Sequence, residues 1–445
     1  MTINLKSLPE SYKSCANKAQ EISPTFCSAK WHMVTLHLAQ GETHSCYHPW
    51  THKIPLEELN KDPGAIHNTE FKKSQRKLML EGVRPKECQY CWTVEDLGNI
   101  SDRFIRNSEP WAKDDLDIFK NYTGNENVYP RHVEVSFSTT CNLKCSYCNP
   151  TVSTKWLEEV EEFGGYRTST NFNDYINPNS PLPFIRDKEY NPYIDAFWKW
   201  LPDAYSHMHI LRITGGEPLL SPHTYKLIDF INDNPNPKLE FIVNSNLCVP
   251  DKNITKLISK AKALVTTNKI KSFKVFASLD SIGDQAEYQR FGLNYNQFQK
   301  NVRRILDEVP FGLVSFTCTF NIFSVPNIKG FVEYMHELIS EYGKRINFDT
   351  PYLRYPPHQC IQILPNEYET YLIKAQEFME EHEFSLITIE KIKRLRAYMT
   401  NKTFTDDEIA MYKKDFVIFV NEHDRRRGTN FFKTFPELID FYNKC

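Results

Sequence analysis

The chain has 445 residues, which exceeds the size of most single domains, so we expect one large domain and one or two smaller units. Its 54 Lys and Arg residues against 56 Asp and Glu residues give a net charge of −2, without the basic field that would hold a phosphate backbone. We therefore do not expect nucleic acid as a partner. No apolar run reaches the roughly 18 residues that span a bilayer, and the first residues lack a secretory signal, so we predict a cytoplasmic protein without a membrane partner.

The twelve cysteines narrow the possible chemistry. Reducing compartments remove disulfides, so clustered cysteines in a cytoplasmic chain more often hold metal. The first predicted domain, residues 1–125, contains five of them, and four are candidate ligands: Cys27, Cys46, Cys88 and Cys91. We therefore expect a metal centre in this domain rather than disulfide bonds.

A hairpin is predicted beside the first two of these cysteines. Residues 31–46 read as a strand, a turn at Gly41 and a return strand, so the thiols of Cys27 and Cys46 can approach the later C-x2-C pair. Four thiolates suit either a tetrahedral zinc ion or a fully ligated iron–sulfur cluster, and ligand type alone does not decide between them. Several histidines crowd the region, and one could replace a cysteine ligand, although we expect each to have a surface or packing role. These histidines are His32, His37, His44, His48 and His52.

The second predicted domain, residues 126–365, repeats strand and helix. The predicted strands are 133–138, 209–214, 240–244, 273–279, 313–320 and 346–353. The connecting helices are amphipathic, and the clearest are 224–233, 254–265 and 328–342. Such alternation implies parallel strands, and six units predict an α/β fold with a partial (β/α)6 TIM-like barrel rather than a closed eight-stranded one.

Polar or metal-binding groups follow four consecutive strands of this domain. The sequences are TTCNLKCSYC, GGEP, NSN and SLD, in that order. In barrels of this kind, chemistry occurs at the carboxyl ends of the strands. We therefore expect the four segments to share one rim.

The first of these segments predicts an iron–sulfur cluster with an open iron. Cys141, Cys145 and Cys148 form a C-x3-C-x2-C loop, which can bring three thiolates around one cube. Three ligands leave one iron for a chelating substrate, whereas a structural or electron-transfer cluster normally takes four protein ligands.

The second segment, Gly215-Gly216-Glu217-Pro218, suits a cofactor contact. Two glycines allow the backbone to approach a ligand closely, and the carboxylate of Glu217 can accept a hydrogen bond from an ammonium group.

The last predicted domain, residues 366–445, reads as a C-terminal helical extension. Its run Arg425-Arg426-Arg427 is expected to be a solvated charge run. Residues 150–200 form a long excursion rich in Asn, Pro and aromatic residues, and we expect it to cover the active site.

Three further residues lie near the ends of the last two predicted strands. Cys318 is flanked by apolar residues in the fifth predicted strand and is expected in the core. Cys360 and Tyr352 follow the sixth strand, where a hydrogen donor would be placed, and either is a candidate for that role.

The motif C-x3-C-x-aromatic-C together with GGEP resembles the radical S-adenosylmethionine (SAM) superfamily. The resemblance implies that SAM chelates the open iron of a [4Fe–4S] cluster through its amino and carboxylate groups. One electron then cleaves SAM to a 5′-deoxyadenosyl radical, which abstracts hydrogen from the substrate. The similarity extends through most of residues 130–355 and implies further cofactor contacts. These implied contacts are Tyr147, Gly215, Gly216, Glu217, Pro218, Asn244, Asn246, Ser278, Asp280 and Arg290.

The N-terminal cysteines resemble the opening of SPASM and twitch domains, C-x9–15-G-x4-C, which bear auxiliary [4Fe–4S] clusters. The resemblance favours iron over zinc at Cys27, Cys46, Cys88 and Cys91. Two departures limit it: the cysteines precede the barrel here instead of following it, and they are too few for the two-cluster SPASM type. The single-cluster twitch type fits better.

The sequence therefore predicts a radical SAM enzyme with two clusters. Its substrate would be a peptide or a small molecule, and an electron donor such as a flavodoxin or ferredoxin would be a partner. The alternative is a non-enzymatic iron–sulfur or zinc protein that senses redox state or binds a partner. That alternative does not account for an open iron beside GGEP and SLD.

Overall fold

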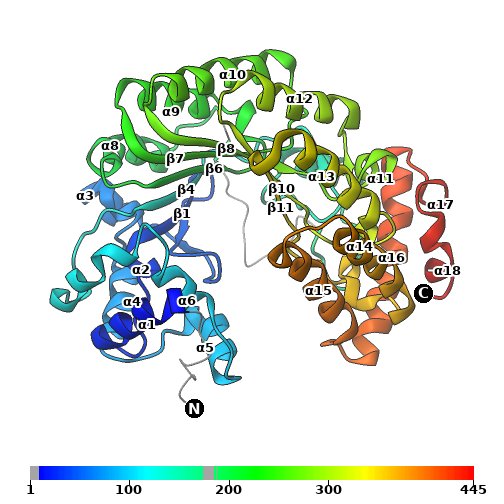
Figure 1. Cartoon of the computed structure of the whole chain (residues 1–445), viewed down its shortest axis with the longest axis horizontal. Coiled ribbons are helices and arrows are strands. Elements are labelled where there is room, and N and C mark those ends of the chain that lie inside the picture. The colour runs from blue at the N-terminus through cyan, green and yellow to red at the C-terminus, as the bar shows by residue number, and fades with distance from the viewer. Residues whose placement is uncertain (1–9, 174–184, 187) are drawn as a thin grey trace. The chain divides into compact units, whose positions relative to one another are not determined.

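A computed structural model describes residues 10–173, 185–186 and 188–445 of the chain. The chain divides into two compact units, each built from three segments (Figure 1). Unit 1 comprises Met1–Ser138, Pro183–Gly215 and Asn236–Ile242, and unit 2 comprises Thr139–Leu182, Gly216–Pro235 and Val243–Cys445. The domain boundaries that we predict at residues 125 and 365 remain predictions.

Unit 1 combines short helices with the first strands of the fold. Its helices are α1 (Glu10–Ile22), α2 (Ala29–His32), α3 (Leu56–Lys61), α4 (Glu70–Leu80), α5 (Gln89–Asp96), α6 (Asp102–Asn107) and α8 (Pro192–Tyr205). Its strands are β1 (Met33–His37), β2 (Glu42–His44), β3 (His52–Lys53), β4 (His132–Ser136), β6 (Ile210–Thr214) and the first part of β7 (Asn236–Ser245).

Unit 2 holds the later strand and helix pairs and the C-terminal helices. Its strands are β5 (Lys144–Cys145), β8 (Ile270–Ser278), β9 (Arg290–Phe291), β10 (Leu313–Thr317) and β11 (Ile346–Asp349). The helices up to the last strand are α7 (Thr154–Phe163), α9 (Pro222–Asp233), α10 (Asp251–Thr266), α11 (Gly283–Gln289), α12 (Tyr295–Glu308) and α13 (Ile328–Tyr342). The C-terminal helices are α14 (Glu369–Glu381), α15 (Leu386–Thr400), α16 (Asp406–Arg427), α17 (Phe431–Thr434) and α18 (Ile439–Asn443).

The α/β class is confirmed by a nine-stranded, mostly parallel sheet of order β11-β10-β8-β7-β6-β4-β1-β2-β3. The six predicted strands are all present, and they neighbour one another in chain order. The predicted hairpin is also present, because β1 pairs antiparallel with β2 around Gly41. In addition β1 pairs parallel with β4, so the hairpin extends the sheet. The partial barrel remains a prediction.

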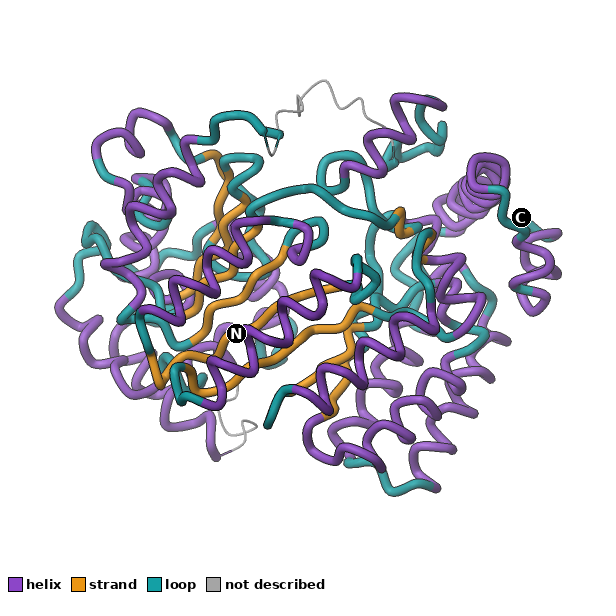
Figure 2. The backbone as a smooth tube through the Cα atoms, turned by 90° about the horizontal axis from the view of Figure 1, so that it is seen from above, coloured by secondary structure: helices purple, strands orange, loops and turns teal. Residues whose placement is uncertain are grey.

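Alternation of apolar and polar residues explains why these segments are strands. In β4, Val133 and Val135 are buried, while Glu134 between them points to the opposite face and meets Arg212 of β6 at 3.3 Å. In unit 2, helices α10, α12 and α13 pack against β8, β10 and β11 respectively (Figures 1 and 2). The amphipathic stripes of the predicted helices therefore serve as core contacts.

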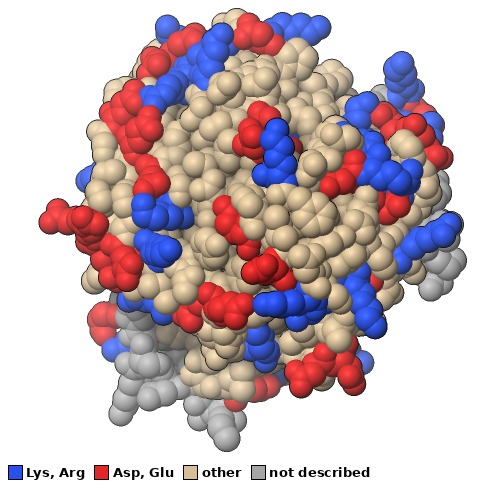
Figure 3. All heavy atoms as spheres, turned by 90° about the vertical axis from the view of Figure 1, so that its right-hand side faces the viewer, with Lys and Arg blue, Asp and Glu red and all other residues tan. Residues whose placement is uncertain are grey.

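The mixture of positive and negative side chains on the surface agrees with the charge balance of the sequence. On the face drawn in Figure 3, Lys and Arg side chains are interspersed with Asp and Glu side chains. Among the described residues, no helix is long and apolar enough to cross a membrane.

Candidate functional site

The cysteines of the C-x3-C-x2-C motif lie on the loop that connects β4 to α7, and each is partly exposed. Burial and, to a smaller extent, the neighbouring Cys145 thiol raise the pKa of Cys141 to about 12. Burial also raises the pKa of Cys148, as do the neighbouring thiols of Cys145 and Cys141. The three thiols therefore lie within electrostatic range of one another, as the ligands of one cluster must.

Side chains from several elements hold the backbone of this loop in place. Trp156 donates its indole N–H to the Cys145 carbonyl at 2.9 Å, and Gln359 donates to the Ser146 carbonyl at 3.0 Å. The amide of Asn173 donates to the Cys148 carbonyl at 2.8 Å. These bonds satisfy three backbone acceptors of the loop.

The GGEP turn lies against the backbone of the cysteine loop. A Cβ atom on Gly216 would stand 2.5 Å from the carbonyl oxygen of Thr140 and 2.6 Å from that of Thr139. Gly215 has a φ of +122°, a conformation open to glycine but strained for other residues. Glycine is therefore required at both positions because the two backbone segments pack closely. The sequence alone indicated a close approach to a ligand instead.

Glu217 is buried and fixes the loop that follows β7. Its carboxylate accepts hydrogen bonds from the backbone N–H of Asn246 at 2.7 Å, the hydroxyl of Ser245 at 2.8 Å and the backbone N–H of Leu219 at 3.1 Å. Burial nevertheless raises the pKa of Glu217 to about 7. A carboxylate that has lost this much solvation gains from a cationic ligand.

Asp280 and Arg290 form a buried ion pair beside Cys145. The Arg290 Nε stands 2.8 Å from Asp280 Oδ2, and its Nη1–H donates to Cys145 Sγ at 3.6 Å. The antiparallel pairing of β5 with β9 produces this contact by placing Cys145 opposite Arg290. The hydroxyl of Tyr147 donates to Asp280 at 2.8 Å and accepts from Arg290.

These contacts bring four of the predicted cofactor residues together, namely Glu217, Asn246, Asp280 and Arg290, through the cysteine loop. Asn246 donates its side-chain amide to Asn142 of that loop at 2.9 Å. Asn244 and Ser278 are partly buried at the carboxyl ends of β7 and β8, and Pro218 begins a short 3₁₀ turn. Their contacts with a cofactor remain predictions, as does the packing of Tyr147 over a cluster or adenine.

The four N-terminal cysteines line a single cavity within unit 1. The lining of this cavity includes Cys27, Cys46, Cys88 and Cys91. Burial raises the pKa of Cys88 and of Cys91 to about 11. Cys27 and Cys88 belong to a hydrophobic core with Phe26, Trp31 and Trp92.

Buried charged groups surround this cavity. Lys30 lines it and forms an ion pair with Glu87. Arg103 also lines it, and its Nε stands 2.8 Å from Glu95, with both side chains only 4% exposed. The ammonium group of Lys30 lowers the pKa of Cys46 and of Cys88 against the effect of burial, which favours the thiolate forms that bind metal.

The five neighbouring histidines have mainly packing roles. His37 and His44 stack on each other, His52 contacts Thr69, and His32 packs on Phe119. His48 alone of the five lines the four-thiol cavity, where it bonds Asp102 at 2.7 Å.

The donor sets fit the implied clusters in ligand type, because three thiols on one loop and four around one cavity are the kind of ligand that iron–sulfur clusters take. Among the described residues, no group of three or more His, Cys, Asp or Glu side chains stands close enough to hold a single metal ion.

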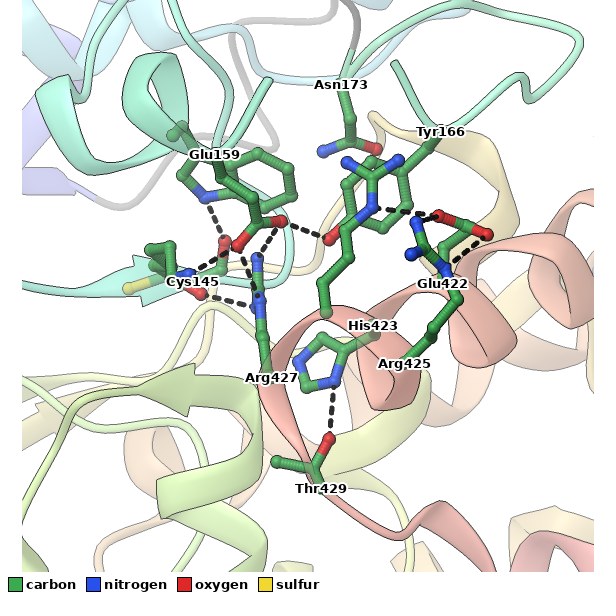
Figure 4. A network of polar contacts seen from close by, with 12 residues as sticks. Cys145, Glu159, Tyr166, Asn173, Glu422, His423, Arg425, Arg427 and Thr429 are labelled. Carbon is green, nitrogen blue, oxygen red and sulfur yellow. Dashed lines mark hydrogen bonds and ion pairs between the residues drawn. The ribbon is translucent and has the colours of Figure 1, made fainter. Parts of the chain in front are cut away.

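One sequence-based prediction is wrong: Arg425-Arg426-Arg427 is not a solvated run. Arg425 has an exposed side chain, but the side chains of Arg426 and Arg427 are 1% and 0% exposed. Arg427 is buried because it pairs with Glu159 of α7, whose side chain is 1% exposed (Figure 4). The sequence signal for this pairing is weak, because the two residues are 268 positions apart.

The remaining candidates have clear positions. Cys318 is fully buried, as predicted for a core residue. Cys360 is also fully buried, while Tyr352 stacks on Tyr398 with ring centroids 3.8 Å apart. Of the predicted cover at 150–200, residues 174–184 and 187 lie outside the described residues.

Neither a family model nor a curated protein sequence matches the chain.

Proposed function

We propose that the chain is a radical SAM enzyme. It would reductively cleave SAM at a [4Fe–4S] cluster held by Cys141, Cys145 and Cys148, and abstract hydrogen from a peptide or small-molecule substrate. The observation that carries this proposal is the meeting of three thiols on one loop with GGEP and the Asp280–Arg290 pair. A non-enzymatic metal protein needs no such assembly of polar groups around three thiols.

The chain's own residues would hold the cofactor by charge and hydrogen bonding. When bound, the cluster and SAM supply the one-electron reduction and the acceptor for the substrate's hydrogen atom. Glu217, once ionised, can accept hydrogen bonds from the ammonium group of SAM, because carboxylates form strong charge-assisted bonds. Arg290 would orient the cofactor's carboxylate while Asp280 keeps its guanidinium in place.

The four thiols of unit 1 support a second, auxiliary [4Fe–4S] cluster. All four line one cavity, so a closed, fully ligated cluster fits the donor count. This cluster would relay an electron or position the substrate.

The partners follow from this chemistry. An electron donor such as a flavodoxin or ferredoxin would be required, and twelve free cysteines suit a reducing, cytoplasmic location. The nearly balanced charge gives no support for nucleic acid as a partner.

The test is anaerobic reconstitution with iron and sulfide, followed by iron counting and product analysis with dithionite and SAM. We expect about eight irons per chain and formation of 5′-deoxyadenosine. A variant with Cys141, Cys145 and Cys148 all replaced by Ala should keep about half of the iron and make no product.

Two outcomes would each contradict one part of the proposal. Four irons with one zinc would contradict the auxiliary cluster but not the radical SAM assignment. Absence of 5′-deoxyadenosine with every reductant would favour the non-enzymatic redox sensor instead.

A further inference from the structure

The loop that carries Cys141, Cys145 and Cys148 is attached to a buried charge network. Arg427, at the end of α16, donates from Nη1 to the backbone carbonyl of Lys144 at 2.9 Å. Its Nε and Nη2 donate to the two carboxylate oxygens of Glu159 at 3.1 and 3.2 Å. Figure 4 shows the guanidinium between Glu159 and the loop at Cys145.

The network contains more positive than negative charge. The ammonium group of Lys144 also pairs with Glu159, at 2.5 Å, so two cations share one carboxylate. Tyr166 donates its hydroxyl to the same carboxylate at 2.5 Å and adds no charge of its own. Arg427 and Glu159 are almost fully buried, so water screens their charges poorly.

This charge lies next to a cluster ligand. Lys144 directly precedes Cys145 in the chain, and Arg427 donates to the backbone carbonyl of Lys144. The arginine also stacks on Trp156 at 4.8 Å, and the indole of Trp156 bonds the Cys145 carbonyl. On its other side Cys145 meets Arg290, but Asp280 balances that guanidinium.

We propose that the Glu159–Arg427 pair sets the reduction potential of the cluster on this loop. The inference rests on the proposed function, because it requires a cluster on the three thiols. A cluster held by three thiolates becomes more negative when it gains an electron, so nearby positive charge stabilises the reduced state. The positive charges of Arg427 and Lys144 stabilise the reduced cluster, and the negative charge of Glu159 limits this stabilisation.

A purely structural role of the Glu159–Arg427 pair makes a different prediction from an electrostatic role. Glu159→Gln and Arg427→Met both break the ion pair between the two side chains, so a purely structural role would make both variants change in the same direction. An electrostatic role gives opposite signs: Glu159→Gln raises the potential by leaving two cations unbalanced, and Arg427→Met lowers it.

The experiment is a redox titration of the reconstituted full chain, followed by electron paramagnetic resonance of the signal that changes when SAM is added. At a fixed potential we expect the ratio of reduced to oxidised cluster to rise about tenfold in Glu159→Gln, equal to about 59 mV for one electron. Arg427→Met should lower it by a similar factor. Arg427→Lys keeps the charge and should stay within about threefold of the wild type.

Arg425→Met is the matched control on the same helix, because its exposed side chain pairs with Glu422 alone among charged groups. It should leave the potential unchanged. If Arg427→Met does not fold, the sign of the Glu159→Gln shift still decides.

Shifts of the same sign in both variants, or an unchanged potential in Glu159→Gln, would overturn the inference alone. A wild-type protein with no SAM-responsive signal would overturn the proposed function and this inference with it. The two failures are therefore distinguishable.

Discussion

The two cysteine sites are built in different ways. The four thiols of unit 1 line a cavity whose walls include the hydrophobic core around Trp31 and Trp92. The three thiols of unit 2 are partly exposed and lie on a loop held by polar contacts with other elements. A site with all ligands supplied by the protein can be enclosed by core, whereas a site that must admit a cofactor has to stay accessible.

Each site nevertheless has a buried guanidinium–carboxylate pair beside its thiols. Arg103 pairs with Glu95 in unit 1, and Arg290 pairs with Asp280 in unit 2. In each pair the carboxylate keeps the guanidinium from being a buried, unpaired cation. The difference between the sites is therefore in enclosure rather than in electrostatics, and the following substitutions test that difference.

Removal of one thiol from each site should show the difference between the two sites most clearly. Cys88→Ala should lower the unfolding temperature of the reconstituted protein by about 10 °C, because metal binding in an enclosed site contributes directly to folding. Cys145→Ala should abolish 5′-deoxyadenosine formation while the unfolding temperature changes by only a few degrees, about 3 °C. Calorimetry and product analysis check both. Equal thermal losses would remove the distinction between an enclosed and an accessible site.

Replacing either buried arginine should reduce stability by a similar amount, but the two replacements should differ in their effect on function. Arg103→Met and Arg290→Met each leave a carboxylate buried without its partner, which costs about 3–5 kcal/mol of unfolding free energy. Only Arg290→Met should prevent SAM binding. Urea unfolding and equilibrium binding of SAM are the measurements.

Arg84→Met is the control for this pair of variants, because the Arg84–Asp96 ion pair is exposed and should be worth less than about 1 kcal/mol. Normal SAM binding by Arg290→Met would contradict the predicted cofactor contact.

Glu217 should make the stability of the cluster-free protein depend on pH. Its pKa of about 7 in the folded state exceeds the usual 4.5, so the folded chain holds the proton more tightly than the unfolded chain. The unfolding free energy should therefore fall as pH rises from about 4.5 to about 7, by about 3 kcal/mol, and stay level above that. Glu217→Gln should lack this component. Urea unfolding at pH 5, 6, 7 and 8 tests it, and a constant difference between the two proteins would refute it.

Gly216→Ala should reduce stability less than the loss of either buried arginine. The added methyl group meets the carbonyl oxygens of Thr139 and Thr140, and such overpacking costs about 1–3 kcal/mol. Gly98→Ala is the control, since it has a φ of +78° but open space around its Cβ, so only backbone strain of about 1 kcal/mol remains. Equal losses in the two variants would show that the GGEP turn does not need close packing.

The sequence predicted the local structure well because that structure follows from local patterns. Alternation in β4 and β8, and apolar spacing in α10 and α13, depend on residues within one or two turns of each other. Cys141, Cys145 and Cys148 could be grouped for the same reason, since their loop is short.

Long-range burial could not be predicted in the same way. The parallel pairing of β1 with β4 joins segments about one hundred residues apart and has no periodic signal. Arg427 follows two other arginines and therefore resembles a surface charge, yet its carboxylate partner comes from α7. A single sequence gives the type of such a side chain but not the distant group that makes its burial possible.

The most direct test of the account is whether SAM binds the cluster on the three-cysteine loop. The reconstituted, dithionite-reduced protein would be measured by electron paramagnetic resonance with and without SAM, in the wild type and in Cys145→Ala. We expect the spectrum of the wild type to change on addition of SAM, because a new ligand on the open iron alters its electronic structure, and the spectrum of Cys145→Ala to stay unchanged. A wild-type spectrum that does not respond to SAM, or a response that persists in Cys145→Ala, would contradict the account.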